Sequence, residues 1–167
     1  MDNELLKLIA ILEKEKENYE SLLKIVENKQ QSVIHGKVDT LRELIIKEQS
    51  IVKKCEKAAC DRIEFISQYC IANNMKATGI PLKDFIGFSP EPEKYKMENL
   101  RYNLKNILNK ISRINKQNDT LLHFSINHLQ NMSKIFLHAD KEEMNMYDFS
   151  GVKYAKNINQ KFVNRQI

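Results

Sequence analysis

Apolar residues return every three or four positions over three long stretches of this chain of 167 residues. In the first stretch, residues 2–34, the repeat passes through Leu5, Leu8, Leu12 and Val26, which keeps these side chains on one face of an α-helix. The same period continues through residues 40–72 and 93–139. Helices of this length belong to bundles or coiled coils, because ordinary helices average about 11–12 residues. The sequence therefore predicts an all-α fold, an antiparallel bundle of three long helices.

The first break in the repeat is short and lies at His35–Asp39. Gly36 is expected to take the left-handed conformation that closes a helix. Thr40 and Glu43 have the spacing of a capping box, with Asp39 as a rival N-cap. A loop of this length makes the two flanking helices antiparallel neighbours.

The second break, residues 73–92, contains two apolar clusters at 80–82 and 85–88. A connection of nearly 20 residues needs packing of its own, and we expect the clusters to cap the open end of the bundle. After residue 139 no period survives. We therefore predict one helical domain over residues 1–139 and a flexible tail over 140–167 that orders on a partner.

Composition narrows the class of protein further. The 4 Gly and 3 Pro are too few for a β-sandwich or barrel, and no apolar run approaches the 18–20 residues of a membrane span. The three cysteines are an odd number without metal-binding or paired spacing, as expected of free thiols in a reducing compartment. We expect a cytoplasmic protein that does not insert into membranes.

Nothing in the sequence favours catalysis, a cofactor or a metal. His123, His128 and His138 stand five and ten residues apart, not the three or four that bring ligands together on a helix. Phosphate-binding loops and nucleophile motifs are lacking. An enzyme is not expected.

A ridge of basic residues follows the third helix at Arg101, Lys105, Arg113 and Lys116. The net charge of the chain is +5, so nucleic-acid backbones are one conceivable partner. The alternative, which we prefer, is a solvated helix face opposite the apolar stripe. We expect no nucleic-acid partner.

The apolar repeat of the third helix is interrupted at Asn115 and Asn118. Asparagine is unfavourable inside a helix because its amide competes for backbone groups. One interpretation is a buried amide that fixes the register of the bundle. The other is a change of role along the helix, in which the residues after Asn118 face a partner. That downstream set is Leu122, Ser125, Ile126, Leu129, Met132 and Phe136.

Several segments together resemble the FlgN-type flagellar export chaperones. The run Ile114–Leu122 followed by Ser125 and Ile126 resembles the family's "LNxxNxxLLxxSL" signature. Other matching segments are Glu17–Leu23, Lys29-Gln30, Gly36–Leu41 with Glu48, and Met146–Asp148 with Gly151, where Met146 replaces the usual threonine of a "TY…G" tail. The resemblance covers most of the chain except residues 73–92.

The resemblance implies a small cytoplasmic helical chaperone without enzymatic activity. Such proteins bind helical terminal segments of hook–filament junction proteins, keep them from assembling and deliver them to the type III export apparatus. Residue by residue, Asn115, Asn118, Leu121 and Leu122 match the central motif and Tyr147 the tail motif. We expect cargo to contact residues 118–136, and the region near Tyr147 to contact cargo or the cytoplasmic domain of the export gate.

A different class of function also fits the pattern. A coiled-coil scaffold or adaptor would use the same apolar stripe to form homo-oligomers, and a homodimer of the free protein is compatible with either interpretation.

Overall fold

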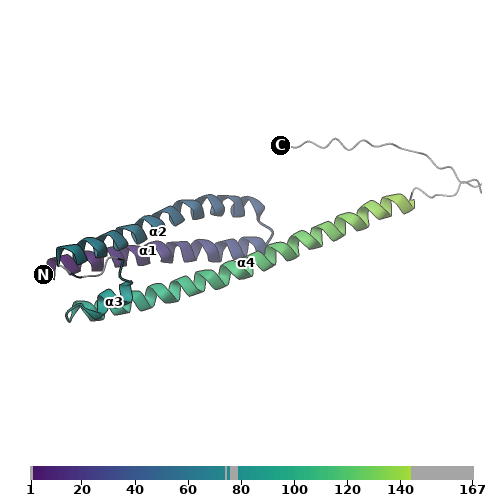
Figure 1. Cartoon of the computed structure of the whole chain (residues 1–167). Coiled ribbons are helices and arrows are strands. Elements are labelled where there is room, and N and C mark those ends of the chain that lie inside the picture. Colours follow the sequence, from purple (N-terminus) through teal and green to yellow (C-terminus); the bar gives the residue numbers. More distant parts are fainter. Residues whose placement is uncertain (1, 74, 76–78, 144–167) are drawn as a thin grey trace, which may run out of the picture. The chain divides into compact units, whose positions relative to one another are not determined.

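The computed structural model describes residues 2–73, 75 and 79–143, and side chains for residues 4–73, 75 and 79–137. It contains four helices: α1 (Asp2–Ile34), α2 (Val38–Ala72), α3 (Leu82–Gly87) and α4 (Glu93–Glu143) (Figure 1). No strand occurs in this described part, and the prediction of an all-α fold with three long helices is confirmed. The short helix α3 was not predicted.

The chain divides into two compact units, Met1–Leu122 and His123–Ile167. The first unit holds α1, α2, α3 and α4 up to Leu122, and the second holds the remainder of α4. Helix α4 is continuous over 51 residues, so its backbone is not interrupted at Asn115 or Asn118. In the described residues no helix has the length and apolar character needed to cross a membrane.

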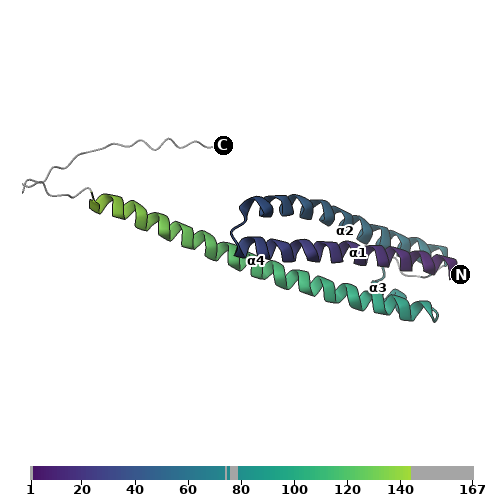
Figure 2. The same cartoon turned by 180° about the vertical axis from the view of Figure 1, so that it is seen from behind.

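Within the first unit, α1 and α2 lie side by side and run in opposite directions (Figures 1 and 2). The turn between them is a Schellman motif, in which the Lys37 N–H donates to the Ser32 carbonyl (2.9 Å) and the Gly36 N–H to the Val33 carbonyl (3.2 Å). Gly36 has a φ of +64°, a conformation that costs other L-residues energy. The predicted left-handed glycine is confirmed.

The predicted capping box at the start of α2 is wrong. The helix begins at Val38, its N-cap is Lys37, and no side chain caps it. The Leu41 N–H already donates to the Lys37 carbonyl at 3.0 Å. Because this first helical hydrogen bond closes before Thr40 is reached, Thr40 lies inside the helix and not at its cap.

The larger core cluster joins all four helices in the first unit. Leu8 and Leu12 of α1, Cys70 of α2, Phe85 of α3 and Met97 of α4 are each no more than 2% exposed. This burial explains why the connection before α4 folds back on the bundle: α3 supplies apolar side chains to the core. Each buried large side chain contributes about 1.5–3 kcal/mol.

The second core cluster lies nearer the turn between α1 and α2. It contains Leu22 and Val26 of α1, Cys55 of α2, and Ile111 and Ile114 of α4. The part of α4 before Leu122 therefore packs against the α1–α2 hairpin along much of its length.

One ion pair interrupts the apolar interior. The Glu15 side chain is 5% exposed and accepts a hydrogen bond from Arg62 Nε to its Oε2 at 2.9 Å. This pair connects α1 to α2 in the middle of the hairpin. A carboxylate so deeply buried requires such a partner.

Candidate partner-binding surface

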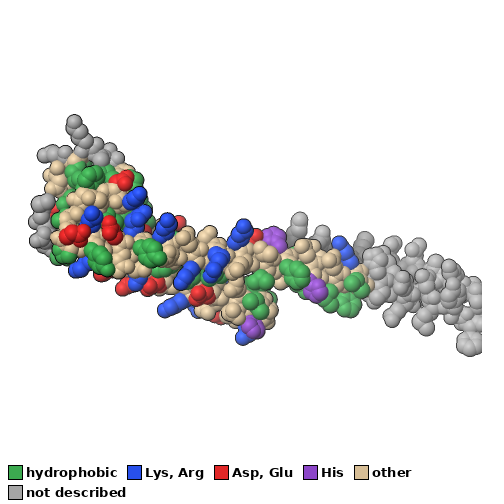
Figure 3. All heavy atoms as spheres, turned by 90° about the horizontal axis from the view of Figure 1, so that it is seen from below, with side chains coloured by type: hydrophobic (Ala, Val, Ile, Leu, Met, Phe, Trp, Pro, Cys, Tyr) green, Lys and Arg blue, Asp and Glu red, His purple; other side chains and the backbone are tan. Residues whose placement is uncertain are grey.

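The described part of the second unit is a helix surface rich in exposed apolar side chains. We call residues 123–137 the apolar segment. Its exposed large hydrophobic residues are Phe124 (70%), Ile126, Leu129 (65%), Met132 (40%), Ile135, Phe136 (64%) and Leu137. Lys134 is the segment's one Lys, Arg, Asp or Glu residue. On the face seen in Figure 3, several hydrophobic side chains lie along this stretch among other side chains and histidines.

These side chains occupy more than half of the helix circumference. At about 100° per residue, Ile126, Leu129 and Phe136 share one side with Met132. Phe124 lies on a neighbouring strip, where its ring stacks with His128 at a centroid distance of 6.4 Å. A helix this apolar is normally covered by another element.

Several of the predicted contact residues lie on this surface, and their contact with a partner stays a prediction. Ile126, Leu129, Met132 and Phe136 are exposed as a partner contact requires, and Ser125 is half-buried. The exposed residues that the prediction missed are Phe124, Ile135 and Leu137. The lack of acidic residues between Thr120 and Asp140 was the signal that could have pointed to them.

The two asparagines of the interrupted repeat have different environments. Asn118 is 4% exposed, and its Nδ2 donates to the Val26 carbonyl of α1 at 3.1 Å. Its buried Oδ1 has no hydrogen-bond donor among the described residues. Asn115, three residues earlier on the helix, is exposed. Asn118 therefore attaches α4 to α1, as the buried-amide interpretation expects, whereas Asn115 does not.

Leu121 and Leu122 are half-buried in the first unit, on different sides of α4. Leu121 lines a groove of about 690 Å³ between α1 and α4, which we call the basic groove. The residues that line it are Gln30, Ile34, Arg113, Lys116, Gln117, Thr120 and Leu121. A hydrogen bond of 3.2 Å from Gln30 Nε2 to Gln117 Oε1 connects the two helices here.

Leu122 lines a smaller hollow of about 330 Å³, to which Asn115 and Asn118 also contribute. Lys29 and Glu48 form an ion pair in this hollow, with Nζ 2.6 Å from Oε2. Leu122 therefore has a structural contact within the first unit. Tyr147, the remaining predicted contact residue, lies outside the described residues.

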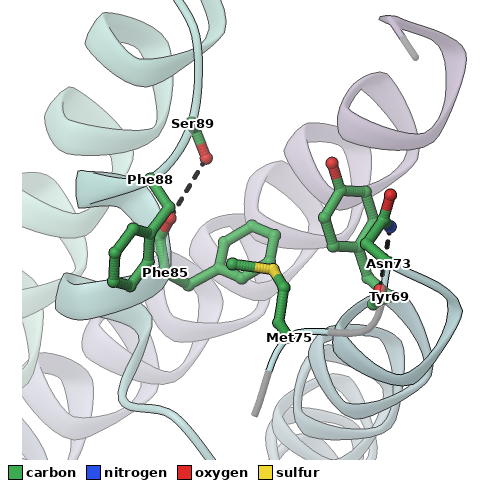
Figure 4. A pocket seen from close by; sticks show the side chains of 6 residues that line it. All are labelled: Tyr69, Asn73, Met75, Phe85, Phe88 and Ser89. Atoms are coloured by element: carbon green, nitrogen blue, oxygen red, sulfur yellow. Dashed lines mark hydrogen bonds between the residues drawn. The ribbon is translucent and has the colours of Figure 1, made fainter. Parts of the chain in front are cut away.

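A third hollow, of about 270 Å³, lies where α2 ends and α3 begins (Figure 4). The rings of Tyr69 and Phe85 meet edge to face at 5.2 Å. Its polar side chains are engaged with the backbone, because Asn73 donates to the Tyr69 carbonyl and Ser89 to the Phe85 carbonyl. We interpret it as a packing feature of the core.

Burial raises the pKa of two titratable groups in the first unit. Burial, followed by the negative charges of Glu15 and Glu56, raises the pKa of the Cys55 thiol to about 11. Burial and the charge of Glu15 also raise the pKa of Tyr19. In the described residues no three His, Cys, Asp or Glu side chains are grouped to hold a metal ion.

Comparison with known protein families gives one match. The family described as FlgN protein matches residues 1–154. No curated protein and no solved structure matches the chain. The matched range includes both the first unit and the apolar segment.

Proposed function

This chain belongs to the FlgN family of flagellar export chaperones, and from that membership we propose its cargo and mode of action. It binds helical terminal segments of hook–filament junction proteins, prevents their premature assembly and delivers them to the type III export apparatus. The role is cytoplasmic and requires no catalysis. The first unit, in which α1, α2, α3 and α4 up to Leu122 pack together, is the scaffold for this task.

The apolar segment is the observation that carries the proposal. Seven large hydrophobic side chains stand exposed on this segment of α4, which contains one charged residue. Terminal helices of filament-forming proteins carry apolar stripes that are buried only after assembly. An amphipathic helix laid along the apolar segment would cover both surfaces, in the manner of helix-in-groove recognition.

Residues 140–167 act in this proposal as a partner-binding tail. Tyr147 would contact the cargo or the cytoplasmic domain of the export gate.

The test replaces single exposed residues of the apolar segment by aspartate. Burying a leucine contributes about 1.5–3 kcal/mol, and Leu129 is 65% exposed, so about 1–2 kcal/mol depends on its burial by cargo. We expect Leu129→Asp and Met132→Asp to raise the Kd for a junction-protein C-terminal segment at least tenfold, because the aspartate also loses hydration. Titration calorimetry measures the Kd.

Asn127→Asp is the matched control, since it adds the same charge to the polar side of the helix and should change the Kd less than threefold. Leu122→Asp is a poorer test, because Leu122 also packs within the first unit. Unchanged affinity in both apolar variants would refute the proposed surface. If the variants instead dissociate a homo-oligomer of the free protein, the scaffold function is favoured.

A further inference from the structure

The basic groove has a composition that the apolar segment lacks. Its walls combine the aliphatic side chains of Ile34 and Leu121 with the cations of Arg113 and Lys116. No aspartate or glutamate lines it. We propose that the basic groove binds an acidic side chain of the cargo helix, together with the apolar residues beside it. This inference rests on the proposed function and assigns cargo a second contact within the first unit.

Arg113 and Lys116 are available for such a contact. Neither groove cation takes part in the ion pairs Lys16–Glu20, Lys29–Glu48, Arg42–Asp39 and Arg62–Glu15. Asp119 lines the smaller hollow on another side of α4.

Carbonyl groups at the end of α1 are partly occupied by the turn that follows it. A helix C-terminus carries partial negative charge on its last carbonyl groups. Here the Schellman motif uses the carbonyls of Ser32 and Val33. The remaining groove groups, the amides of Gln30 and Gln117, are hydrogen-bonded to each other. The positive charge of the groove therefore complements an anionic group of a partner.

Charge also distinguishes between the candidate occupants of the groove. Residues 144–167 contain three lysines and one arginine against a single aspartate, so this chain's own C-terminus would be repelled. Nucleic acid would be expected to follow the whole basic ridge and to need no aliphatic wall. A helix that carries acidic and apolar residues side by side complements both properties of the groove.

The groove is large enough for several side chains but not for a second bundle. Its volume of about 690 Å³ is in the usual range of ligand pockets, about 300–1,000 Å³. One helical turn presents two or three side chains to such a groove. We therefore expect one carboxylate of the cargo to lie between Arg113 and Lys116.

Charge reversal tests this inference in the full-length chain. The variant Arg113→Glu/Lys116→Glu is compared with Lys105→Glu/Lys110→Glu, which changes the net charge equally on exposed residues outside the groove. Titration calorimetry with the junction-protein C-terminal segment, at low and at high salt, measures the Kd. We expect the groove variant to raise the Kd at least tenfold and the control less than threefold. High salt should weaken binding of the segment to the wild type more than binding of the segment to the groove variant.

Each outcome distinguishes the two proposals. If the wild type binds the segment and both variants bind equally, whether unchanged or equally weakened, the groove inference is overturned while the proposed function stands. If the wild type binds no segment, both fail. If light scattering shows that the groove variant disrupts a dimer while cargo affinity is unchanged, the groove belongs to a second copy and the inference is overturned. Restored affinity from a Glu→Lys or Asp→Lys variant of the segment would identify the cargo residue in the groove.

Discussion

Replacing Arg62 by methionine would test how the first unit tolerates charge in its interior. Arg62 bonds to Glu15 through Nε at 2.9 Å and more weakly through Nη2 at 3.5 Å. The Glu15 side chain is 5% exposed, whereas that of Arg62 is 21% exposed. Methionine retains most of the aliphatic stem, so the change removes the charge more than the packing. It leaves the Glu15 carboxylate buried without its partner.

The expected loss is large because the remaining charge is not solvated. Breaking a buried pair by removing one partner costs about 3–5 kcal/mol. The first unit has 122 residues, and an unfolding entropy of about 2.1 cal/mol/K per residue gives about 0.26 kcal/mol/K. The predicted fall in Tm is therefore about 12–20 °C.

Thermal unfolding followed by circular dichroism measures this fall. Lys16→Met is the matched control, because Lys16 pairs with Glu20 at the surface with side chains 33% and 44% exposed. Such a pair is worth about 0.2–0.5 kcal/mol, so its Tm should drop by no more than about 2 °C. The double variant Glu15→Met/Arg62→Met should recover most of the stability. A fall below 4 °C for Arg62→Met would refute the view that Glu15 depends on this pair.

Three further predictions concern the core. Cys60 is exposed while Cys55 and Cys70 are buried. A thiol reagent at pH 8 should therefore label Cys60 alone, as detected by mass spectrometry, until the protein is denatured. Labelling of Cys55 at a similar rate would contradict its burial. The pKa values of Cys55 and Tyr19 are raised in the folded protein, so the unfolded chain loses these protons first as the pH rises. The free energy of unfolding should therefore fall by on the order of 2 kcal/mol between about pH 9 and 11. Urea titrations at constant ionic strength that show no fall would contradict this prediction. Asn118→Leu should keep or raise the free energy of unfolding. It removes the buried Oδ1, which has no donor among the described residues, and it loses one hydrogen bond of about 1 kcal/mol from Nδ2. A loss above 2 kcal/mol in urea denaturation would show that Oδ1 is satisfied.

The helices and the hairpin turn were accessible to sequence reasoning because their signals are local and repeated. A stripe that persists over 30 residues specifies a helix, and Gly36 stands where the stripe stops. The start of α2 was harder to place. Asp39, Thr40 and Glu43 offer capping chemistry, but the Schellman turn brings the chain into helical geometry at Val38. Turn geometry thus overrode the capping preference.

Helix α3 and the two asparagines show where periodicity loses information. Six residues are too few to display a helical period, so Leu82–Gly87 could be recognised only as an apolar cluster. Asn115 and Asn118 stand in one turn of the sequence pattern. Side chains three positions apart on a helix nevertheless point in directions that differ by about 60° around the helix axis. That rotation is enough to bury Asn118 and expose Asn115.

The basic groove could not be predicted from the sequence, because two of its seven lining residues come from the end of α1. The sequence placed Arg113 and Lys116 on a basic ridge with Arg101 and Lys105. Only the packing of α4 against α1 brings Gln30 and Ile34 beside Arg113 and Lys116. The exposed apolar residues after Leu122 were predictable in part, since their spacing is a property of one helix.

The central claim, that the chain holds a terminal helix of a junction protein, is tested most directly by complex formation. The purified full-length chain is mixed with the C-terminal segment of a hook–filament junction protein and analysed by sizing chromatography with light scattering. The account predicts a stable heterocomplex whose mass is the sum of the bound chains, and loss of that complex with Leu129→Asp. Absence of a heterocomplex, with the chain alone running as a dimer or larger, would contradict it.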